Sequence, residues 1–292
     1  MVTSPPTHGS NLKDPTLLTF RGKNPGKTLS IFAGVHGNEI GGVLALRDLI
    51  KDIKDDKIII KNGTLHLVFA NPTAISLGVR QTDMNMNRSF HVNNSDVPIE
   101  LQRAYERQRA ISLQILLDES DALLDLHSTL TETSPLVICE KHSFEIAKLL
   151  PFPLVSTGWD QVHPGSTDAY MNLQGKVGIC VECGQHNDPE AKARARTSIE
   201  IFLRELDLVN TNIKSEPVLQ RHVRARFIYK ATTCMTFIPA HREQFCNVKK
   251  GELLGMDGDK EVRAGQESIL FFPKEGAKNG EEAFVLGEVL PF

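Results

Sequence analysis

The feature that most constrains the fold is a short turn between a predicted strand and a predicted helix. Residues 28–33 are largely apolar and favour β structure, so they predict a buried strand. Residues 40–53 carry apolar side chains at helical spacing. The turn between them, residues 34–39, has the sequence Gly-Val-His-Gly-Asn-Glu. A strand that leads directly into a helix is typical of open α/β sheets, which place their chemistry at such turns.

Two side chains of this turn are able to bind one metal ion. His36 and Glu39 are three positions apart, and the glycines on both sides of His36 let the backbone bend tightly. Among divalent metals, zinc suits this combination of nitrogen and oxygen ligands best. The pattern His-x-x-Glu is loose, and a second copy runs from His142 to Glu145. We interpret that copy as structural, because it lacks flanking glycines and opens a predicted surface helix.

A third ligand is expected at the end of another strand. The apolar segment 122–126 leads directly to His127. Two histidines and one carboxylate leave a coordination position open, which is typical of catalytic rather than structural zinc. His36, Glu39 and His127 therefore predict a site for one zinc ion per chain.

Such a site needs a carboxylate that does not bind the metal. Water on the zinc loses a proton near neutral pH, and a separate group must accept that proton. Glu182 ends the apolar segment 177–181 and is our candidate, with a capping or salt-bridging acid as the alternative. Asp125 projects to the same side of its strand as His127. It is expected either to orient a ligand imidazole or to be an ordinary satisfied core residue.

The rest of the pattern predicts an α/β domain over residues 1–212 and a small β domain over residues 213–292. Residues 73–96 are polar and irregular, and a loop of this length is usually functional or disordered. After Asn212 short strand-like runs alternate with turns. The predicted strands are 16–20, 28–33, 64–70, 122–126, 136–139, 177–182, 218–228, 235–238 and 268–272, and the predicted helices are 40–53, 98–119, 166–175 and 188–208.

Composition argues against several kinds of partner. A net charge of −3 gives no reason to expect nucleic acid or an anionic membrane. No apolar stretch approaches the length of a membrane span, and the first ten residues lack the pattern of a signal peptide. Five scattered cysteines, an odd number, favour a reducing, cytoplasmic location over a disulfide framework. Homo-oligomer formation stays open.

Five segments, in this order along the chain, resemble the aspartoacylase/succinylglutamate desuccinylase family of zinc carboxypeptidase-like hydrolases. They are residues 34–39, 71–72, 87–90, 125–127 and 181–184. The resemblance implies an α/β fold in which a mixed sheet is sandwiched by helices and is followed by a small C-terminal β domain. It also implies the three zinc ligands named above, with Glu182 as general base and acid.

The same resemblance implies roles for three residues of the polar loop. Arg80 would polarise the scissile carbonyl, and Asn87 and Arg88 would hold the α-carboxylate of the substrate. These roles agree with the chemistry of arginine, which binds carboxylates in bidentate fashion and stabilises a developing oxyanion. The alternative for both arginines is a salt bridge that anchors the loop.

The resemblance implies a zinc-dependent hydrolase that cleaves the amide bond of an N-acyl amino acid, with metal-activated water and a glutamate general base. A zinc carboxypeptidase acting on short peptides is the alternative, because it needs the same groups. A metal-binding module without catalysis is a third hypothesis, but simple binding needs neither Glu182 nor Arg80. Cys180 and Cys183 have the spacing of a redox or zinc motif, although they lie within a predicted strand.

The sequence departs from the family where the second carboxylate of the substrate is bound. Aspartoacylases carry an arginine shortly before the catalytic glutamate, but residues 171–175 here are Met-Asn-Leu-Gln-Gly. A carboxylate buried without a cation is costly. We therefore expect neutral or apolar N-acyl amino acids to be hydrolysed faster than N-acetylaspartate or N-succinylglutamate. Lys176, His163, Arg224 or Arg226 would reverse this preference by supplying the missing charge.

Overall fold

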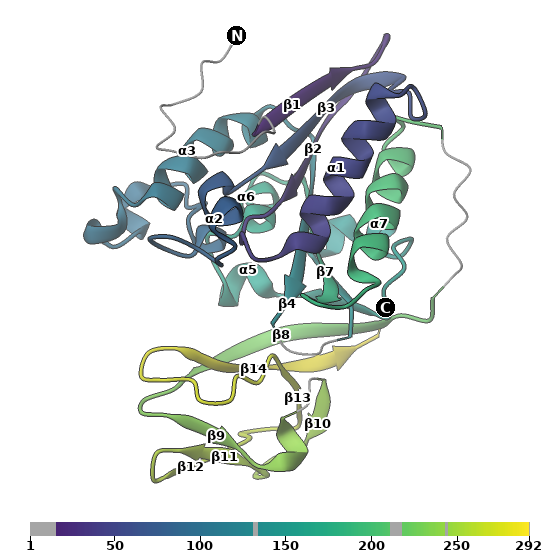
Figure 1. The fold of residues 1–292 in the computed structure, drawn as a ribbon. Helices are drawn as coiled ribbons and strands as arrows, with labels where there is room; N and C mark the ends of the chain where they lie inside the picture. The colour runs from purple at the N-terminus through teal and green to yellow at the C-terminus, as the bar shows by residue number, and fades with distance from the viewer. Residues whose placement is uncertain (1–15, 131–133, 211–217, 243–244, 292) are drawn as a thin grey trace.

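The computed structural model describes residues 16–130, 134–210, 218–242 and 245–291 (Figure 1). Within these ranges the chain forms a large mixed sheet flanked by helices and a small sheet near the C-terminus, which confirms the predicted fold class. The large sheet has 11 strands in the order β1 (Leu17–Arg21), β3 (Asn62–Phe69), β2 (Asn24–Ala33), β4 (Ala122–Thr129), β7 (Val177–Gln185), β5 (Leu136–Cys139), β6 (Leu154–Thr157), β8 (Arg221–Lys230), β14 (Glu282–Leu290), β13 (Ser268–Phe271) and β10 (Cys246–Val248). The small sheet contains β12 (Lys260–Arg263), β11 (Leu253–Asp257) and β9 (Met235–Phe237).

Helices cover both faces of the α/β part of the large sheet. On one face α1 (Ile40–Lys54) and α7 (Ala191–Glu205) lie side by side (Figure 1). On the other face pack α3 (Tyr105–Asp118) and α6 (Thr167–Leu173). The remaining helical segments are short: α2 (Pro72–Leu77), α4 (Phe144–Ala147), α5 (Trp159–Val162), η1 (Met86–Arg88), η2 (Asn94–Asp96), η3 (Ile99–Leu101), η4 (Lys141–Ser143) and η5 (Pro239–His241).

The central strands are buried on both faces because their side chains alternate between two cores. In β2, Leu29 and Ile31 pack with α1 and α7, whereas Phe32 packs with α3 and α6. In β4, Leu124 faces the first core and Leu123 the second. Each of the two helix layers therefore covers a continuous apolar surface of the sheet.

The order and direction of three strands bring the predicted site residues together. β2 is parallel to β4, and β4 is parallel to β7. Their carboxyl ends meet at one edge of the sheet, where α/β proteins place their ligands. β2 leads into the turn 34–39 at this edge, and His127 of β4 is in register with Glu182 of β7.

Two elements differ from their predicted form. The helix expected over 98–119 begins only at Tyr105, because Ala104 is extended and the Asp83 carboxylate accepts the Tyr105 N–H at 2.8 Å. Residues 73–77, expected to be irregular, belong to α2. The Asn71 side chain caps this helix by accepting the Ala74 N–H, and Pro72 fits its first turn. The pair Asn71-Pro72 therefore marks the start of a helix as well as the end of a strand.

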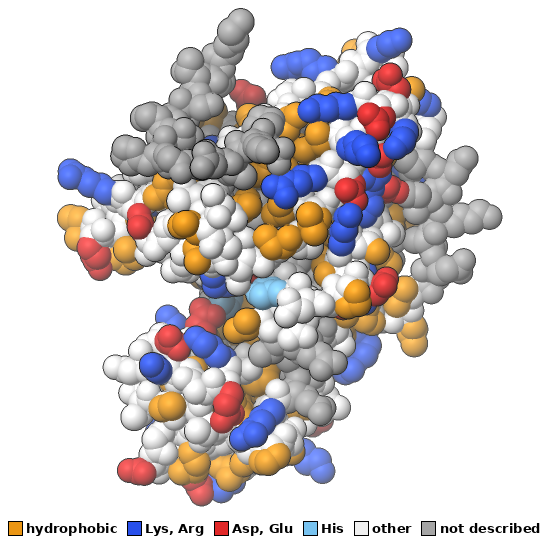
Figure 2. Space-filling view, in the orientation of Figure 1, with side chains coloured by type: hydrophobic (Ala, Val, Ile, Leu, Met, Phe, Trp, Pro, Cys, Tyr) orange, Lys and Arg blue, Asp and Glu red, His pale blue; other side chains and the backbone are white. Residues whose placement is uncertain are grey.

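The boundary predicted at residue 212 lies outside the described residues, and the division into two domains stays a prediction. The large sheet itself continues into the tail, because β8 pairs with β6 in parallel and β14 pairs with β8. Figure 2 shows the surface hollowed between the α/β part and the strands of the tail. No described helix combines the length and the apolar character that a membrane crossing requires.

Candidate functional site

Two glycines fix the shape of the turn 34–39. Gly34 has a φ of +68°, a left-handed conformation that glycine adopts without strain. A Cβ added at Gly37 would lie 2.0 Å from the carbonyl carbon of Ala74, so a side chain would push the turn away from α2. The Gly37 N–H donates to the Arg80 carbonyl at 3.2 Å. The turn is therefore held against the segment that follows β3.

The three predicted ligands converge at this turn. One ligand atom from each of His36, Glu39 and His127 lies within 4.8 Å of the others. Glu39 Oε1 is 2.7 Å from His36 Nδ1, and Glu39 Oε2 is 3.0 Å from His127 Nδ1. The Ser128 N–H donates to Glu39 Oε2 at 3.0 Å and orients the carboxylate. All three ligand side chains are buried, as expected for a defined metal site rather than a chance surface cluster.

The outer nitrogens of both imidazoles also face oxygen atoms. His36 Nε2 is 2.9 Å from Asn85 Oδ1, and His127 Nε2 is 2.9 Å from Asp125 Oδ2. Each imidazole thus has an acceptor at both nitrogens, whereas a neutral imidazole has a single N–H. When the outer N–H groups donate to Asn85 and Asp125, both Nδ1 atoms present lone pairs toward Glu39. A cation among these three groups satisfies them all, so the donor set fits zinc.

The ionisation of these side chains indicates a position that attracts positive charge. Burial by itself raises the pKa of Glu39, but His36 and His127 outweigh it and hold the pKa well below its usual range. Burial by itself lowers the pKa of His127, but Asp125 and Glu39 outweigh it and raise the pKa well above its ordinary value. For His36 burial prevails over Glu39 and lowers the pKa. A neutral imidazole and an ionised carboxylate are the forms that bind metals.

Glu182 lies beside the ligands, opposite His127 across the strand pair. Its Oε2 atom is buried and has no hydrogen-bond partner among the described residues. The pKa of Glu182 is raised to about 7, mainly by burial; His127 and Arg80 oppose the shift, and Glu39 and Asp125 add to it. A carboxylate with such a pKa and an unpaired oxygen is able to accept and return a proton near neutral pH.

The loop after α2 carries the predicted substrate-binding residues. Arg80 is half exposed, and its Nη1 donates to Glu39 Oε1 at 3.2 Å, beside the metal ligands. Asn87 Oδ1 accepts the Thr167 N–H at 3.1 Å. Arg88 Nη1 donates to the Asn87 carbonyl at 2.6 Å, and burial lowers the pKa of Arg88 to about 10. The roles of Arg80, Asn87 and Arg88 toward substrate stay predictions.

Sequence analysis did not identify Glu106, which organises this loop from the first turn of α3. Its carboxylate accepts hydrogen bonds from the N–H groups of residues 82–84 and from the side chains of Thr82 and Asn71, at 2.6–3.2 Å. The five donors saturate the carboxylate, and they fix the loop that precedes the predicted substrate-binding residues. In the sequence Glu106 is only one acid near the start of a helix. Acids are common at that position, so nothing distinguishes Glu106 from the others.

The structure assigns other partners to most cations that could replace the missing family arginine. Lys176 Nζ donates to main-chain carbonyl groups at the end of α3, at 3.2 and 2.7 Å. Arg226 forms a surface ion pair, and Arg224 lines a hollow beside α5 together with Asn172 of the segment 171–175. His163 pairs with an acid of the tail, Glu282, at 3.3 Å. Of the candidate cations, Lys176 and Arg226 therefore have other partners within the described part of the chain.

Cys180 and Cys183 lie on opposite faces of β7 and pack into different cores. Both are buried free thiols, and burial raises the pKa of each. Thiols of this kind are poor nucleophiles and poor metal ligands. The structure therefore gives no support to a redox or zinc motif at these positions.

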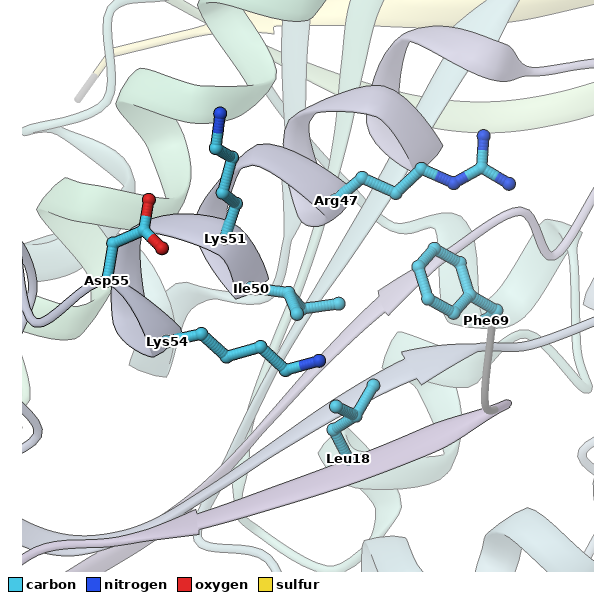
Figure 3. A pocket seen from close by; sticks show the side chains of 7 residues that line it. All are labelled: Leu18, Arg47, Ile50, Lys51, Lys54, Asp55 and Phe69. Atoms are coloured by element: carbon cyan, nitrogen blue, oxygen red, sulfur yellow. The ribbon is translucent and has the colours of Figure 1, made fainter. Parts of the chain in front are cut away.

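A separate hollow of about 290 Å³ lies between α1 and the strands β1 and β3 (Figure 3). Leu18, Ile50 and Phe69 form its apolar part, and the side chain of Lys54 extends over it from α1. None of the predicted ligands, nor Glu182, lines this hollow. It lies apart from the predicted metal ligands.

Comparisons with known proteins agree with the geometry. Residues 25–205 match the model of the succinylglutamate desuccinylase/aspartoacylase catalytic domain. A succinylglutamate desuccinylase of Shewanella sp. (strain W3-18-1) is 29% identical over 288 residues, covering 85% of this chain and 79% of that protein. An aspartoacylase of Xenopus tropicalis is 30% identical over 123 residues, covering 40% of this chain and 39% of that protein. The crystal structure of a succinylglutamate desuccinylase from Vibrio cholerae shares the fold, with a TM-score of 0.77 at 19% identity over 96% of this chain and 93% of that one.

Proposed function

Because the chain belongs to the succinylglutamate desuccinylase/aspartoacylase family, we propose that it hydrolyses N-acyl amino acids. We propose further that this hydrolysis depends on zinc. The observation that carries the proposal is the convergence of His36, Glu39 and His127 beside Glu182. The relatives named succinylglutamate desuccinylase and aspartoacylase support the substrate class. The bond cleaved is the amide between the acyl group and the amino acid nitrogen.

The two histidines and Glu39 would hold the zinc ion. When bound, zinc supplies a Lewis acid that favours ionisation of water and polarises a carbonyl oxygen. Asn85 and Asp125 orient the two imidazoles by accepting their outer N–H groups. Thr167 donates to Asp125 Oδ2 at 2.5 Å and holds that carboxylate in place.

Glu182 would move the proton. Its unpaired Oε2 takes a proton from the attacking water and returns it to the amide nitrogen as the carbon–nitrogen bond breaks. The pKa of about 7 suits both steps, because the carboxyl group then changes charge readily near neutral pH. Burial, the main cause of the raised pKa, also keeps bulk water from competing for the proton.

The remaining roles fall to the loop after α2. Arg80, next to Glu39, would stabilise the negative charge that develops on the scissile carbonyl oxygen. Arg88 and Asn87 would hold the α-carboxylate of the amino acid, because a guanidinium matches a carboxylate in bidentate fashion. Both sets of contacts orient the amide bond beside Glu182.

A substrate panel on zinc-loaded protein tests the proposal. We expect hydrolysis of N-acyl amino acids such as N-acetylmethionine, with short peptides cleaved more slowly, measured as release of free amino acid. Faster cleavage of peptides would favour a carboxypeptidase instead. Hydrolysis of neither class would refute the hydrolase assignment.

Metal analysis tests the ligand set separately. Purified protein is expected to hold about one zinc per chain, because the three ligands define one site. His127→Ala removes one ligand and should lower zinc occupancy sharply. The variant His142→Ala is the matched control, since His142 bonds only the Lys176 carbonyl among the described residues. Full occupancy in His127→Ala would remove His127 from the site.

A further inference from the structure

We propose that Glu282, from the C-terminal tail, makes the substrate pocket select against a second carboxylate and in favour of a positively charged side chain. The inference rests on the proposed function, because it concerns the amino acid released at the same site. Glu282 is the first residue of β14, a strand that reaches the α/β part through its pairing with β8. In Figure 1 these two strands run beneath α5.

Glu282 approaches the substrate-binding loop through His163. Glu282 Oε2 is 3.3 Å from His163 Nε2. His163 is 7% exposed, and its Nδ1 atom has no hydrogen-bond partner among the described residues. The main chain of residues 165–167 then bonds residues 87–90 twice, at 2.8 and 3.1 Å. The acid of the tail and the predicted carboxylate-binding residues thus share one corner of the molecule.

Charges of both signs surround Arg88 in this corner, and Glu282 is the strongest of its acids. Among the surrounding groups, Glu282 is the acid that most favours the charged form of Arg88, and Asp168 acts in the same direction more weakly. Arg80 opposes both, so two carboxylates and a second guanidinium act on Arg88. The Glu282 side chain is 44% exposed, so it is partly accessible to a ligand. Its cross-strand neighbour Lys230 forms no ion pair with it within the described part of the chain.

This arrangement restricts the amino acid that binds. The side chain and the α-carboxylate of an amino acid are attached to the same carbon, so groups around Arg88 also meet the side chain. A second carboxylate would lie near Glu282, and Arg88, the guanidinium next to that acid, is already assigned to the α-carboxylate, so the repulsion from Glu282 would weaken binding. An ammonium group would gain an ion pair, and a neutral side chain would gain or lose little.

The variant Glu282→Gln tests this inference, because it keeps the side-chain volume and removes the charge. Zinc-loaded full-length protein is assayed with Nα-acetyllysine, N-acetylmethionine and N-acetylglutamate, whose side chains are positive, neutral and negative. We expect the wild type to prefer lysine over glutamate in kcat/KM. In the variant this preference should fall by about tenfold, while N-acetylmethionine changes by less than about threefold, as for one partly exposed charge pair.

Two control variants separate charge from shape and from stability. Glu281→Gln removes the same charge one residue away, where the side chain pairs with Lys274 at the surface, and should leave the preference unchanged. Glu282→Asp retains the carboxylate and should retain most of the preference. The unfolding temperature of each variant is measured, so that a shift in preference is compared only among folded proteins.

Binding of the free amino acids gives a readout that does not depend on turnover. Calorimetry with lysine, methionine and glutamate should show the same order, with the same change in Glu282→Gln. If the wild type hydrolyses no N-acyl amino acid, the proposed function fails, whereas these binding constants still decide the role of Glu282. An unchanged lysine-to-glutamate ratio in folded Glu282→Gln, or a wild type that prefers glutamate, overturns the inference.

Discussion

Glu106 and Glu182 are both carboxylates of the protein interior, and their surroundings are opposite. Glu106 accepts five hydrogen bonds, and these donors lower its pKa although burial alone would raise it. Glu182 has a buried oxygen without a partner among the described residues, and burial raises its pKa to about 7. A saturated carboxylate is fixed in charge and position, so it builds structure. An unsaturated one changes charge near neutral pH, so it is suited to chemistry.

The two acids are nevertheless linked through the loop after α2. Glu106 fixes residues 82–84, and the residues directly after them reach the metal site: Asn85 Oδ1 contacts His36 and also accepts the Asn87 N–H at 2.9 Å. Glu106 thus positions the loop that carries the predicted substrate-binding residues, and Glu182 would act on the substrate held there. Variants of Glu182 should lose turnover, whereas variants of Glu106 should mainly lose stability.

The largest effect is expected from Glu182→Gln. The amide keeps the shape of the side chain but accepts no proton, so turnover should fall by roughly two to four orders of magnitude. Zinc content and the free energy of unfolding should change little, since no hydrogen bond to Oε2 is lost. Steady-state kinetics on the preferred N-acyl amino acid give the measurement. Turnover equal to that of the wild type would show that Glu182 is a buried acid without a role in the reaction.

The two arginines of the loop should differ in the kinetic constant they change. Arg80→Ala removes a contact that strengthens as charge develops, so kcat should fall by about 100-fold. Arg88→Ala removes a contact present in ground and transition states alike, so mainly KM should rise. The reverse pattern would exchange the two roles.

Glu106→Gln should mainly reduce stability. Its NH₂ group would face N–H donors of residues 82–84, which leaves buried donors unpaired and costs roughly 2–3 kcal/mol. Urea unfolding measures this loss, and KM should rise as the loop loosens. Glu100→Gln, an exposed acid of η3, is the matched control and should be neutral. A Glu106 variant as stable as the control would contradict the structural role.

The smallest effect concerns acid stability. Because the folded pKa of Glu106 is below its unfolded value, its ionised form stabilises the fold above the ordinary carboxyl pKa. This contribution is lost as the pH falls through the lowered folded pKa. Unfolding free energies at pH 7 and pH 4 should therefore differ less in Glu106→Gln than in the wild type. An equal difference in both proteins would show that Glu106 titrates alike in the folded and unfolded chain.

The convergence of His36, Glu39 and His127 could be predicted from the sequence, because parallel strands place their carboxyl ends at one edge. His36 and His127 each follow an apolar segment that predicts a strand. Once the two strands are parallel neighbours, the two side chains lie at the same edge of the sheet. Glu106 could not be predicted, since its partners are backbone N–H groups of a distant irregular loop. The position of Glu282 could not be predicted either. In the sequence Glu281 and Glu282 are neighbouring acids of the same type, and only the register of β14 shows which one lies opposite β8.

The continuity of the large sheet across residue 212 means that the tail cannot be handled as a detachable module. A chain cut after residue 210 would leave the backbone groups of β6 that now bond β8 unpaired. It would also uncover Leu154 and Trp159, which pack against Val223 and Phe271 of the tail. A bare strand edge beside an apolar patch is a template for self-association. Expression of the α/β part alone should therefore yield aggregates, and chimaeras between relatives should exchange the tail together with β6.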